Sequence, residues 1–246
     1  MNSAPEVYSS RTFASDPGYV RLFGDFVAEA TVRDNLTGPR ILEICCGDGV
    51  LLMHLLKHIP GSSGTGLDLS LDNIAFARRL AATCTGVPPQ FIAGDYLMTQ
   101  LPVHDLVVSH NALHLLPGED DRLWGKIAGE VETGGALIIS MPYDCLYNRM
   151  LELVRRGLRL IRCRPVEAGL FWLSKLLYGR SCSDALLRDR ASYNFVVPCR
   201  YYTSALAEAL REKWQLEQVA EKPEPRLLGK PAHKYIHLRR CRKGGA

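Results

Sequence analysis

Three acidic residues stand close to glycines in the first hundred residues, and their spacing suits the binding of a nucleoside. Glu43 lies in the stretch ILEICCGDGV just before a glycine turn, Asp68 ends the next apolar run in GTGLDLS, and Asp95 follows Gly94 after the third. A carboxylate at the end of a strand can accept hydrogen bonds from two ribose hydroxyls or from an adenine amino group. Because three carboxylates would repel phosphates, the pattern favours a nucleoside that lacks them.

The spacing of the turn glycines argues against two commoner ligands. A dinucleotide fingerprint needs G-x-G-x-x-G, and the position of its third glycine is Leu52 in this chain. A phosphate-binding P-loop ends in Gly-Lys-Ser/Thr, and Gly49 is instead followed by Val50. We therefore expect Gly47 and Gly49 to bring the backbone close to an uncharged part of the ligand.

A second group of chemically useful residues follows the fourth apolar run, in SHNALHLL. His110 and His114 are candidate catalytic bases, because histidine titrates near neutrality and can take a proton from a substrate. Asn111 between them is a candidate substrate-binding residue. The alternative is that His110 only orients the substrate and that His114 points into the protein and hydrogen-bonds a carbonyl. We find no cluster of Asp and Asn suited to binding a metal ion, so we predict no metal.

These residues would be positioned by strands that alternate with helices. Apolar runs fall at 41–45, 65–69, 90–93, 106–109 and 136–141, and helical patterns at 51–58, 72–82 and 120–131. This alternation predicts a parallel sheet with helices on both faces, and ligands of such sheets bind beyond the carboxyl ends of the strands. TSALAEALREK predicts a later helix, and WQLEQVAEK with KYIHLRR predicts an antiparallel hairpin at the sheet edge.

Five segments in order, LEICCGDG, GLDLS, GDYL, DLVVSHNALHLLP and GGALIIS, resemble the motifs of the class I S-adenosylmethionine-dependent methyltransferases, small-molecule branch. The resemblance covers about residues 40–141 and, more loosely, the final helix and hairpin. It implies a doubly wound, Rossmann-like α/β fold whose seven-stranded sheet ends in the antiparallel hairpin. It also implies S-adenosyl-L-methionine as cofactor. Two positions depart from the family pattern: Cys45 replaces the first turn glycine, and His110 stands where small or amide residues are common.

The resemblance also implies roles for single residues. Asp68 would bind ribose, Leu69 would pack on adenine, and Asp95 with Tyr96 would hold its edge, while Glu43 would help shape the methionine end of the pocket. The full cofactor-binding set is Glu43, Cys45, Gly47, Gly49, Asp68, Leu69, Asp95, Tyr96 and Ser109. Two structural alternatives stay open, because Glu43 can instead order the backbone amides of the turn and Gly-Asp is also a common turn pair.

Regular alternation stops after the fifth strand, which divides the chain into three parts. We expect an N-terminal helical segment at 1–39, a core at 40–141 and 201–241, and a helical lid insertion at 142–200. The N-terminal helix is predicted by apolar spacing at Tyr19, Phe23, Phe26 and Val27. The lid is expected to cover the pocket and select the acceptor.

The predicted lid is basic, with ten Arg and Lys residues against four acids from Arg149 to Arg190, a larger excess than the +4 of the whole chain. Arg155, Arg159 and Arg162 fall on one helical face. That face can be a solvated surface, bind an anionic acceptor group, or meet an anionic membrane surface. LFWLSKLLYG is predicted to be a buried lid helix rather than a membrane anchor. The candidate substrate-binding residues are Tyr19, Asn111, Tyr143, Arg155 and Arg159.

Composition narrows the class of protein. Of 246 residues 47% are hydrophobic and 23% charged, which is ordinary for a globular protein, and the charge of +4 gives no sign of nucleic-acid binding. Eight cysteines without a CxxC pair favour a reducing compartment. The chain shows no signal peptide and no apolar run of membrane-spanning length. We expect a cytoplasmic monomer or homodimer, with membrane contact limited to the surface.

The expected function is methyl transfer to a small metabolite that is bulky and apolar, with an anionic group as a further option. Carbon, oxygen and nitrogen targets stay open, and small-molecule biosynthesis or secondary metabolism is the expected setting. One alternative is an enzyme of the same fold that catalyses a rearrangement or cyclisation. Others are a membrane-associated methyltransferase of lipids or quinones and a non-enzymatic scaffold.

Overall fold

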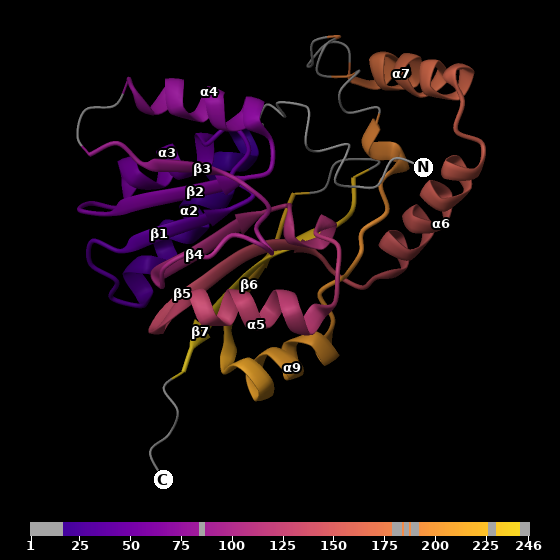
Figure 1. Cartoon of the computed structure of the whole chain (residues 1–246). Helices are drawn as coiled ribbons and strands as arrows, with labels where there is room; N and C mark the ends of the chain where they lie inside the picture. The colour runs from indigo at the N-terminus through magenta and orange to yellow at the C-terminus, as the bar shows by residue number, and fades with distance from the viewer. Residues whose placement is uncertain are drawn as a thin grey trace.

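The computed structural model describes residues 17–83, 87–178, 184, 187, 192–225 and 230–241. It is built on a seven-stranded sheet in the order β3-β2-β1-β4-β5-β7-β6 (Figure 1). The strands are β1 (Arg40–Ile44), β2 (Ser63–Asp68), β3 (Gln90–Ala93), β4 (His104–His110), β5 (Val131–Pro142), β6 (Leu216–Pro223) and β7 (His233–Arg240). β1 to β5 pair in parallel, whereas β7 is antiparallel to both β5 and β6. The predicted Rossmann-like sheet and closing hairpin are confirmed.

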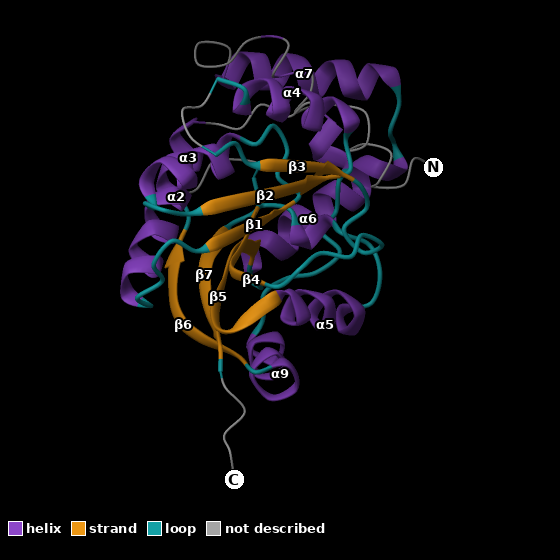
Figure 2. Ribbon diagram, turned by 60° about the vertical axis from the view of Figure 1, so that its left-hand side comes forward, coloured by secondary structure: helices purple, strands orange, loops and turns teal. Residues whose placement is uncertain are grey.

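Helices cover both faces of the sheet, which explains why the central strands are continuous apolar runs. α2 (Pro17–Arg33), α3 (Val50–His58) and α4 (Leu71–Ala81) pack on one face, and α5 (Asp120–Glu130) and α9 (Ser204–Trp214) pack on the other (Figure 2). In β4, Leu106, Val107 and Val108 point to alternate faces and are all fully buried. The helices predicted at 51–58, 72–82 and 120–131 agree with α3, α4 and α5 to within one residue.

The first described helix is fastened to the last strand by a buried polar contact. Asp34 follows α2, and its Oδ2 lies 2.8 Å from Nε2 of His237 in β7. The side chain of Asp34 is 2% exposed and that of His237 is fully buried. Phe23 and Val27 of α2 are fully buried in the core, as the apolar spacing predicts. The first sixteen residues of the predicted N-terminal segment lie outside the described residues.

Two further helices follow β5, α6 (Leu146–Leu160) and α7 (Arg164–Tyr178), with a short 3-10 turn, η2 (Ser192–Phe195), after them. Figure 1 shows α6 and α7 on the outer side of the molecule, beyond the point where β5 ends. The prediction that LFWLSKLLYG is buried is wrong for Trp172, Leu173 and Leu176, which are 64%, 52% and 83% exposed. None of the described helices is both long enough and apolar enough to cross a membrane.

Candidate functional site

The turn between β1 and α3 has one open side and one packed side. Gly47 and Gly49 adopt left-handed φ angles of 54° and 76°. A Cβ added at Gly49 would stand 2.7 Å from the ring of Phe91, whereas a Cβ at Gly47 would meet no atom within 4 Å. The open space therefore lies at Gly47, where a ligand can approach the backbone closely.

Cys45, the departure from the family glycine pattern, keeps the glycine conformation. Its φ of 57° is left-handed, which costs a residue with a Cβ about 1–2 kcal/mol. Burial raises the pKa of the Cys45 thiol, and the nearby carboxylates of Asp68, Glu43 and Asp95 raise it further. The thiol is therefore neutral near pH 7. The carboxylates around the turn give it a negative charge that suits a cationic ligand.

Asp68 joins the two turns that meet at the centre of the sheet. Its Oδ2 accepts from the amide of Gly47 at 2.9 Å, and its Oδ1 accepts from Ser70 N at 2.9 Å and Asn73 Nδ2 at 3.2 Å. The residue is 8% exposed, and its neighbour Leu69 is 40% exposed. A nearly buried carboxylate and an open apolar side chain thus stand side by side at the end of β2.

Glu43 binds a backbone amide next to the turn, which is the structural role that the sequence left open. Its Oε2 accepts from Leu52 N at 3.0 Å, which supports the first turn of α3. It is 3% exposed, and burial raises its pKa well above the ordinary value, with Asp48 and Asp68 adding to the shift. Direct contact of Glu43 with a ligand stays a prediction.

Of the other predicted cofactor-binding residues, some have exposed side chains and others have side chains buried in the core. Asp95 is exposed, and its Oδ1 accepts from Leu97 N at 2.9 Å. Tyr96 is 2% exposed and donates to Glu130 Oε2 at 2.6 Å. Ser109 is fully buried and donates to Ile44 O at 3.0 Å. Asp95 and Leu69 can meet a ligand with their side chains, whereas Tyr96 and Ser109 use theirs within the core.

A second polar group lies at the ends of β4 and β5, and sequence reasoning missed half of it. Ser140 is the register partner of His110 across these strands. Its Oγ lies 2.6 Å from Asn111 Oδ1 and 2.8 Å from Glu224 Oε2. Ser140 ends the fifth apolar run and could have been noticed there. Glu224 follows the hairpin strand in EKPEPR, where no pattern marks it.

The histidine and the carboxyl of this second group have shifted pKa values. Burial, with His233 and Lys230 nearby, lowers the pKa of His110 to about 3. Its ring stacks on Phe23 with centroids 4.8 Å apart, and its Nε2 lies 3.1 Å from Asn111 Nδ2. Burial raises the pKa of Glu224, against the hydrogen bonds from Ser140 and Asn111 that lower it. His110 is therefore uncharged at neutral pH.

The second predicted base, His114, packs inside the protein. It is 5% exposed, and its ring lies against His233 with centroids 5.2 Å apart. Burial lowers its pKa well below the ordinary value, and burial lowers that of His233 to about 4. Among the described residues, His114 Nδ1 has no hydrogen-bond partner. A catalytic role for His110 or His114 stays a prediction.

The predicted substrate-binding residues occupy different environments. Tyr143 is half-buried with Lys234 Nζ 4.9 Å from its ring centre. Arg155 is 7% exposed and donates to Val196 O at 2.9 Å, whereas Arg159 on the same helix is exposed. The side chain of Tyr19 lies outside the described part of the chain. Arg155 thus fastens α6 to the segment before α9.

Arg200 is a second residue that sequence reasoning missed. It is 6% exposed and donates to the carbonyls of Leu113 and Leu116 at 2.7 Å and of Gly118 at 3.0 Å. It also pairs with Asp120 Oδ1 at 2.7 Å. These bonds hold the loop after β4, including the 3-10 turn η1 (Leu113–Leu115), in one conformation.

Comparison with known proteins agrees with the sheet order. Residues 41–135 match the family model of the methyltransferase domain. This part of the chain is therefore similar to a methyltransferase domain. A release factor glutamine methyltransferase of Bradyrhizobium diazoefficiens is 42% identical over 169 residues, which are 58% of this chain and 56% of that protein. A trans-aconitate 2-methyltransferase of Streptomyces avermitilis is 32% identical over 46% of this chain and 43% of that protein. The chain spans about half the length of these curated relatives.

Solved methyltransferases share the fold over nearly the whole chain. Magnesium protoporphyrin IX methyltransferase from Synechocystis PCC 6803 superposes with a TM-score of 0.58 and 17% identity, covering 91% of this chain and 83% of that one. A plantazolicin methyltransferase superposes with a TM-score of 0.56 and 15% identity, covering 92% and 87%. At such identities the likeness establishes the fold of this chain and nothing finer.

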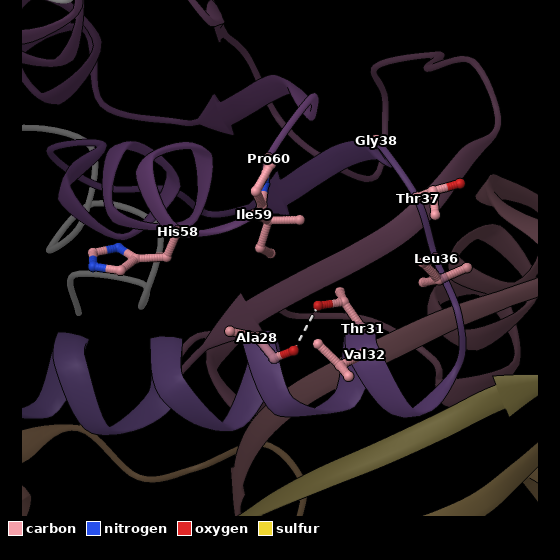
Figure 3. A pocket seen from close by; sticks show the side chains of 9 residues that line it. All are labelled: Ala28, Thr31, Val32, Leu36, Thr37, Gly38, His58, Ile59 and Pro60. Atoms are coloured by element: carbon pink, nitrogen blue, oxygen red, sulfur yellow. Dashed lines mark hydrogen bonds between the residues drawn. The ribbon is translucent and has the colours of Figure 1, made fainter.

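A separate hollow of about 270 Å³ lies near the amino end of β1 of the methyltransferase sheet (Figure 3). It is lined by the end of α2, the loop before β1 and the end of α3, with Thr31 donating to Ala28 O at 2.7 Å. Its lining residues are Ala28, Thr31, Val32, Leu36, Thr37, Gly38, His58, Ile59 and Pro60. None of the predicted site residues lines it.

Proposed function

We propose that the protein transfers a methyl group from S-adenosyl-L-methionine to a small-molecule acceptor. The observation that carries the proposal is the arrangement at the end of β2, where Asp68 contacts the open glycine turn and Leu69 is exposed beside it. The surrounding acids favour a cationic ligand without phosphates. The match of residues 41–135 to the methyltransferase domain model and the names of similar proteins support the same activity.

The residues present fit this cofactor. An ionised carboxylate has about four acceptor positions, and Asp68 uses three within the protein, which leaves one for a ribose hydroxyl. Leu69 offers an apolar surface for adenine, and the exposed Asp95 offers an acceptor for its amino group. The open side of Gly47 allows close approach of the methionine part. When bound, the cofactor supplies a methyl group on a positively charged sulfur, which an acceptor atom takes up.

Glu224 is the proposed proton acceptor where the substrate loses a proton. It is 8% exposed, its pKa is raised by burial, and it contacts Ser140 Oγ at 2.8 Å. A carboxylate with a raised pKa is a stronger base than one in water. His110 is a weaker candidate, because its low pKa makes it a poor base and its Nε2 already lies 3.1 Å from the Asn111 amide. His110 and Asn111 are better suited to orienting the acceptor.

The proposed acceptor is a bulky, apolar small molecule that carries an anionic group. Lys230 lies close enough to His110, His233 and Glu224 to lower their pKa values, and Arg155 has the same effect on His114 and His233. Positive charge of this kind beside the proposed base suits an anionic substituent. The relatives act on a release factor glutamine and on trans-aconitate, so their names do not identify one acceptor.

Calorimetry tests the proposal most directly. We expect binding of S-adenosyl-L-methionine and of its demethylated product, and negligible binding of NAD. Tight NAD binding without binding of the product would overturn the proposal. Incubation with cofactor and a metabolite extract, followed by mass spectrometry, distinguishes methylation from rearrangement, because only methylation adds one methyl group to a metabolite.

A further inference from the structure

Helix α6 presents its apolar side to solvent and its polar side to the protein. Its exposed apolar residues recur at helical spacing and form one stripe: Leu146, Met150, Leu153, Val154 and Leu160, continued by Ile161 after the helix. They are 57% to 89% exposed. The buried residues of α6 are instead Asn148 and Arg155. This is the reverse of an ordinary surface helix, whose apolar stripe faces the core.

Polar contacts hold α6 in this orientation. Asn148 Nδ2 donates to Tyr143 O at 2.7 Å and to Ala232 O at 2.9 Å, and its Oδ1 accepts from Ala232 N at 2.7 Å. Arg155 adds its bond to Val196 O on the same side of the helix. Because buried polar groups are costly to unpair, α6 cannot rotate its apolar stripe inward without breaking these bonds.

Helix α7, which follows α6 after three residues, carries a second group of exposed apolar residues. Trp172, Leu173 and Leu176 are each more than half exposed, and Lys175 Nζ lies 5.4 Å from the Trp172 ring centre. Figure 1 shows α7 following α6 on the outer side of the molecule. We call the exposed apolar residues of both helices, with Ile161, the α6–α7 face.

We propose that the α6–α7 face docks onto an anionic lipid surface. An in-plane membrane helix combines an apolar stripe with arginine and lysine beside it, and often a tryptophan. Arg149 and Arg156 border the α6 stripe in this way, and both are more than half exposed. Docking in the plane of the surface needs no membrane-spanning helix.

The charges favour lipid over a second copy of the chain. In a symmetric dimer the same patch would meet itself, so the exposed Arg149, Arg156 and Arg159 of α6 would face the same arginines of the second copy. Arg149 and Arg156 pair with Asp144 and Glu152. Exposed ion pairs of this kind are worth about 0–1 kcal/mol, so lipid phosphates can replace the acids at little cost. An anionic surface therefore complements both the apolar and the basic residues.

Vesicle sedimentation with the full chain tests the docking. We expect binding to phosphatidylcholine vesicles that contain phosphatidylserine, weaker binding to phosphatidylcholine alone, and loss of binding as salt rises. The double variant Leu153→Asp with Leu160→Asp should reduce the partition coefficient at least about tenfold, because both charges would enter the apolar boundary. The matched control Val87→Asp, at an 88% exposed valine elsewhere, should bind as the wild type does.

A second readout is tryptophan fluorescence. Vesicle binding should shift the emission to shorter wavelength, and Trp172→Phe should remove the shift, because Trp124 is fully buried and Trp214 lies on α9. Unchanged circular dichroism and unchanged binding of the demethylated cofactor would show that the variants fold, and they separate this inference from the proposed function. Absence of binding to anionic vesicles would overturn the inference. Equal vesicle binding by the wild type and the double variant would also overturn the inference. The same holds if the wild type does not bind vesicles but forms a dimer that the double variant abolishes.

Discussion

At the scale of single residues, the site depends on carboxylates that have structural partners as well as proposed ligands. Asp68 accepts from both turns that meet at the centre of the sheet, and Glu43 accepts from the first turn of α3. Removing such a side chain leaves buried amides unpaired, so truncation to alanine mixes loss of binding with loss of structure. Isosteric amide variants separate the two effects better.

Asp68→Asn should weaken cofactor binding while preserving the fold. The amide keeps the shape of the side chain and loses the charge that strengthens a hydrogen bond to ribose. We expect the dissociation constant of the demethylated cofactor to rise about 10- to 150-fold, which is about 1.5–3 kcal/mol. Calorimetry measures this, with Asp72→Asn at an exposed position of the first turn of α4 as the control. An unchanged constant in a folded Asp68→Asn variant would exclude the residue from the cofactor site.

Glu224→Gln should reduce turnover by about 10²–10⁴-fold if Glu224 is the base. The wild-type rate should rise with pH through a pKa above the ordinary 4.5 of a glutamate, because burial raises it and only the deprotonated form accepts a proton. The sequence alone suggests instead a step near pH 6.5 from His110, whereas burial in the structure lowers the pKa of His110 to about 3. Glu221→Gln, an exposed neighbour on β6, is the control. Full turnover in Glu224→Gln would reduce Glu224 to a partner of Ser140.

Buried neutral histidines should make the fold sensitive to mild acid. The pKa of His110 is about 3 when folded and about 6.5 when unfolded, so the unfolded chain binds more protons below pH 6.5. The contribution of His110 to the free energy of unfolding is therefore fully present above about pH 6.5 and is lost as the pH falls toward 3. Lowering the pH from 7 to 5 should cost the wild type about 2 kcal/mol more than His110→Phe, whose ring can still stack on Phe23. Urea unfolding at both pH values checks this, and equal losses in the two proteins would contradict it.

At the scale of elements, periodicity predicts that a segment is a helix but not which face meets the protein. The sequence predicts an arginine face that includes Arg155 and Arg159 of α6. A surface helix ordinarily turns its apolar stripe toward the core. The structure reverses this because Asn148 and Arg155 find backbone partners at Ala232 and Val196, distant in sequence. Such partners carry no local signal.

Asn148→Ala should loosen α6 without unfolding the sheet. The variant removes the Asn148 side chain that bonds to the Ala232 amide and to the carbonyls of Tyr143 and Ala232, of which the Ala232 carbonyl still accepts from Tyr143 N. We expect the local opening free energy of α6 to fall by about 2–4 kcal/mol. Hydrogen exchange read by mass spectrometry should speed up in residues 146–160 and stay unchanged in β4. Arg159→Ala, at an exposed position of the same helix, should leave both rates as they are. Unaltered exchange in Asn148→Ala would show that other contacts orient the helix.

At the scale of the whole molecule, the sheet could be predicted because its signals are local. Each central strand is an apolar run bounded by glycine or an acid, and each crossover helix has its own periodicity, so topology rules complete the order. The strand-end acids Asp68 and Asp95 follow from that order. Glu224 could not be predicted, because it reaches Ser140 only after β6 and β7 have closed the sheet. Nor could the sequence tell that Leu69 is exposed and Tyr96 buried.

The strand order also means that β5 is synthesised well before its neighbour β7. β5 takes β7 as its neighbour on one side, yet β7 begins only at His233, long after β5 ends at Pro142. At about 5–20 residues per second, a ribosome needs roughly 5–20 s to make the intervening chain. During that interval one edge of β5, with Leu137, Ile138 and Ile139, has no strand beside it. An unpaired apolar strand edge can pair with the same edge of another nascent chain and aggregate. The yield of this protein in a cell therefore depends on how well the edge of β5 is protected from such pairing until β7 has been made.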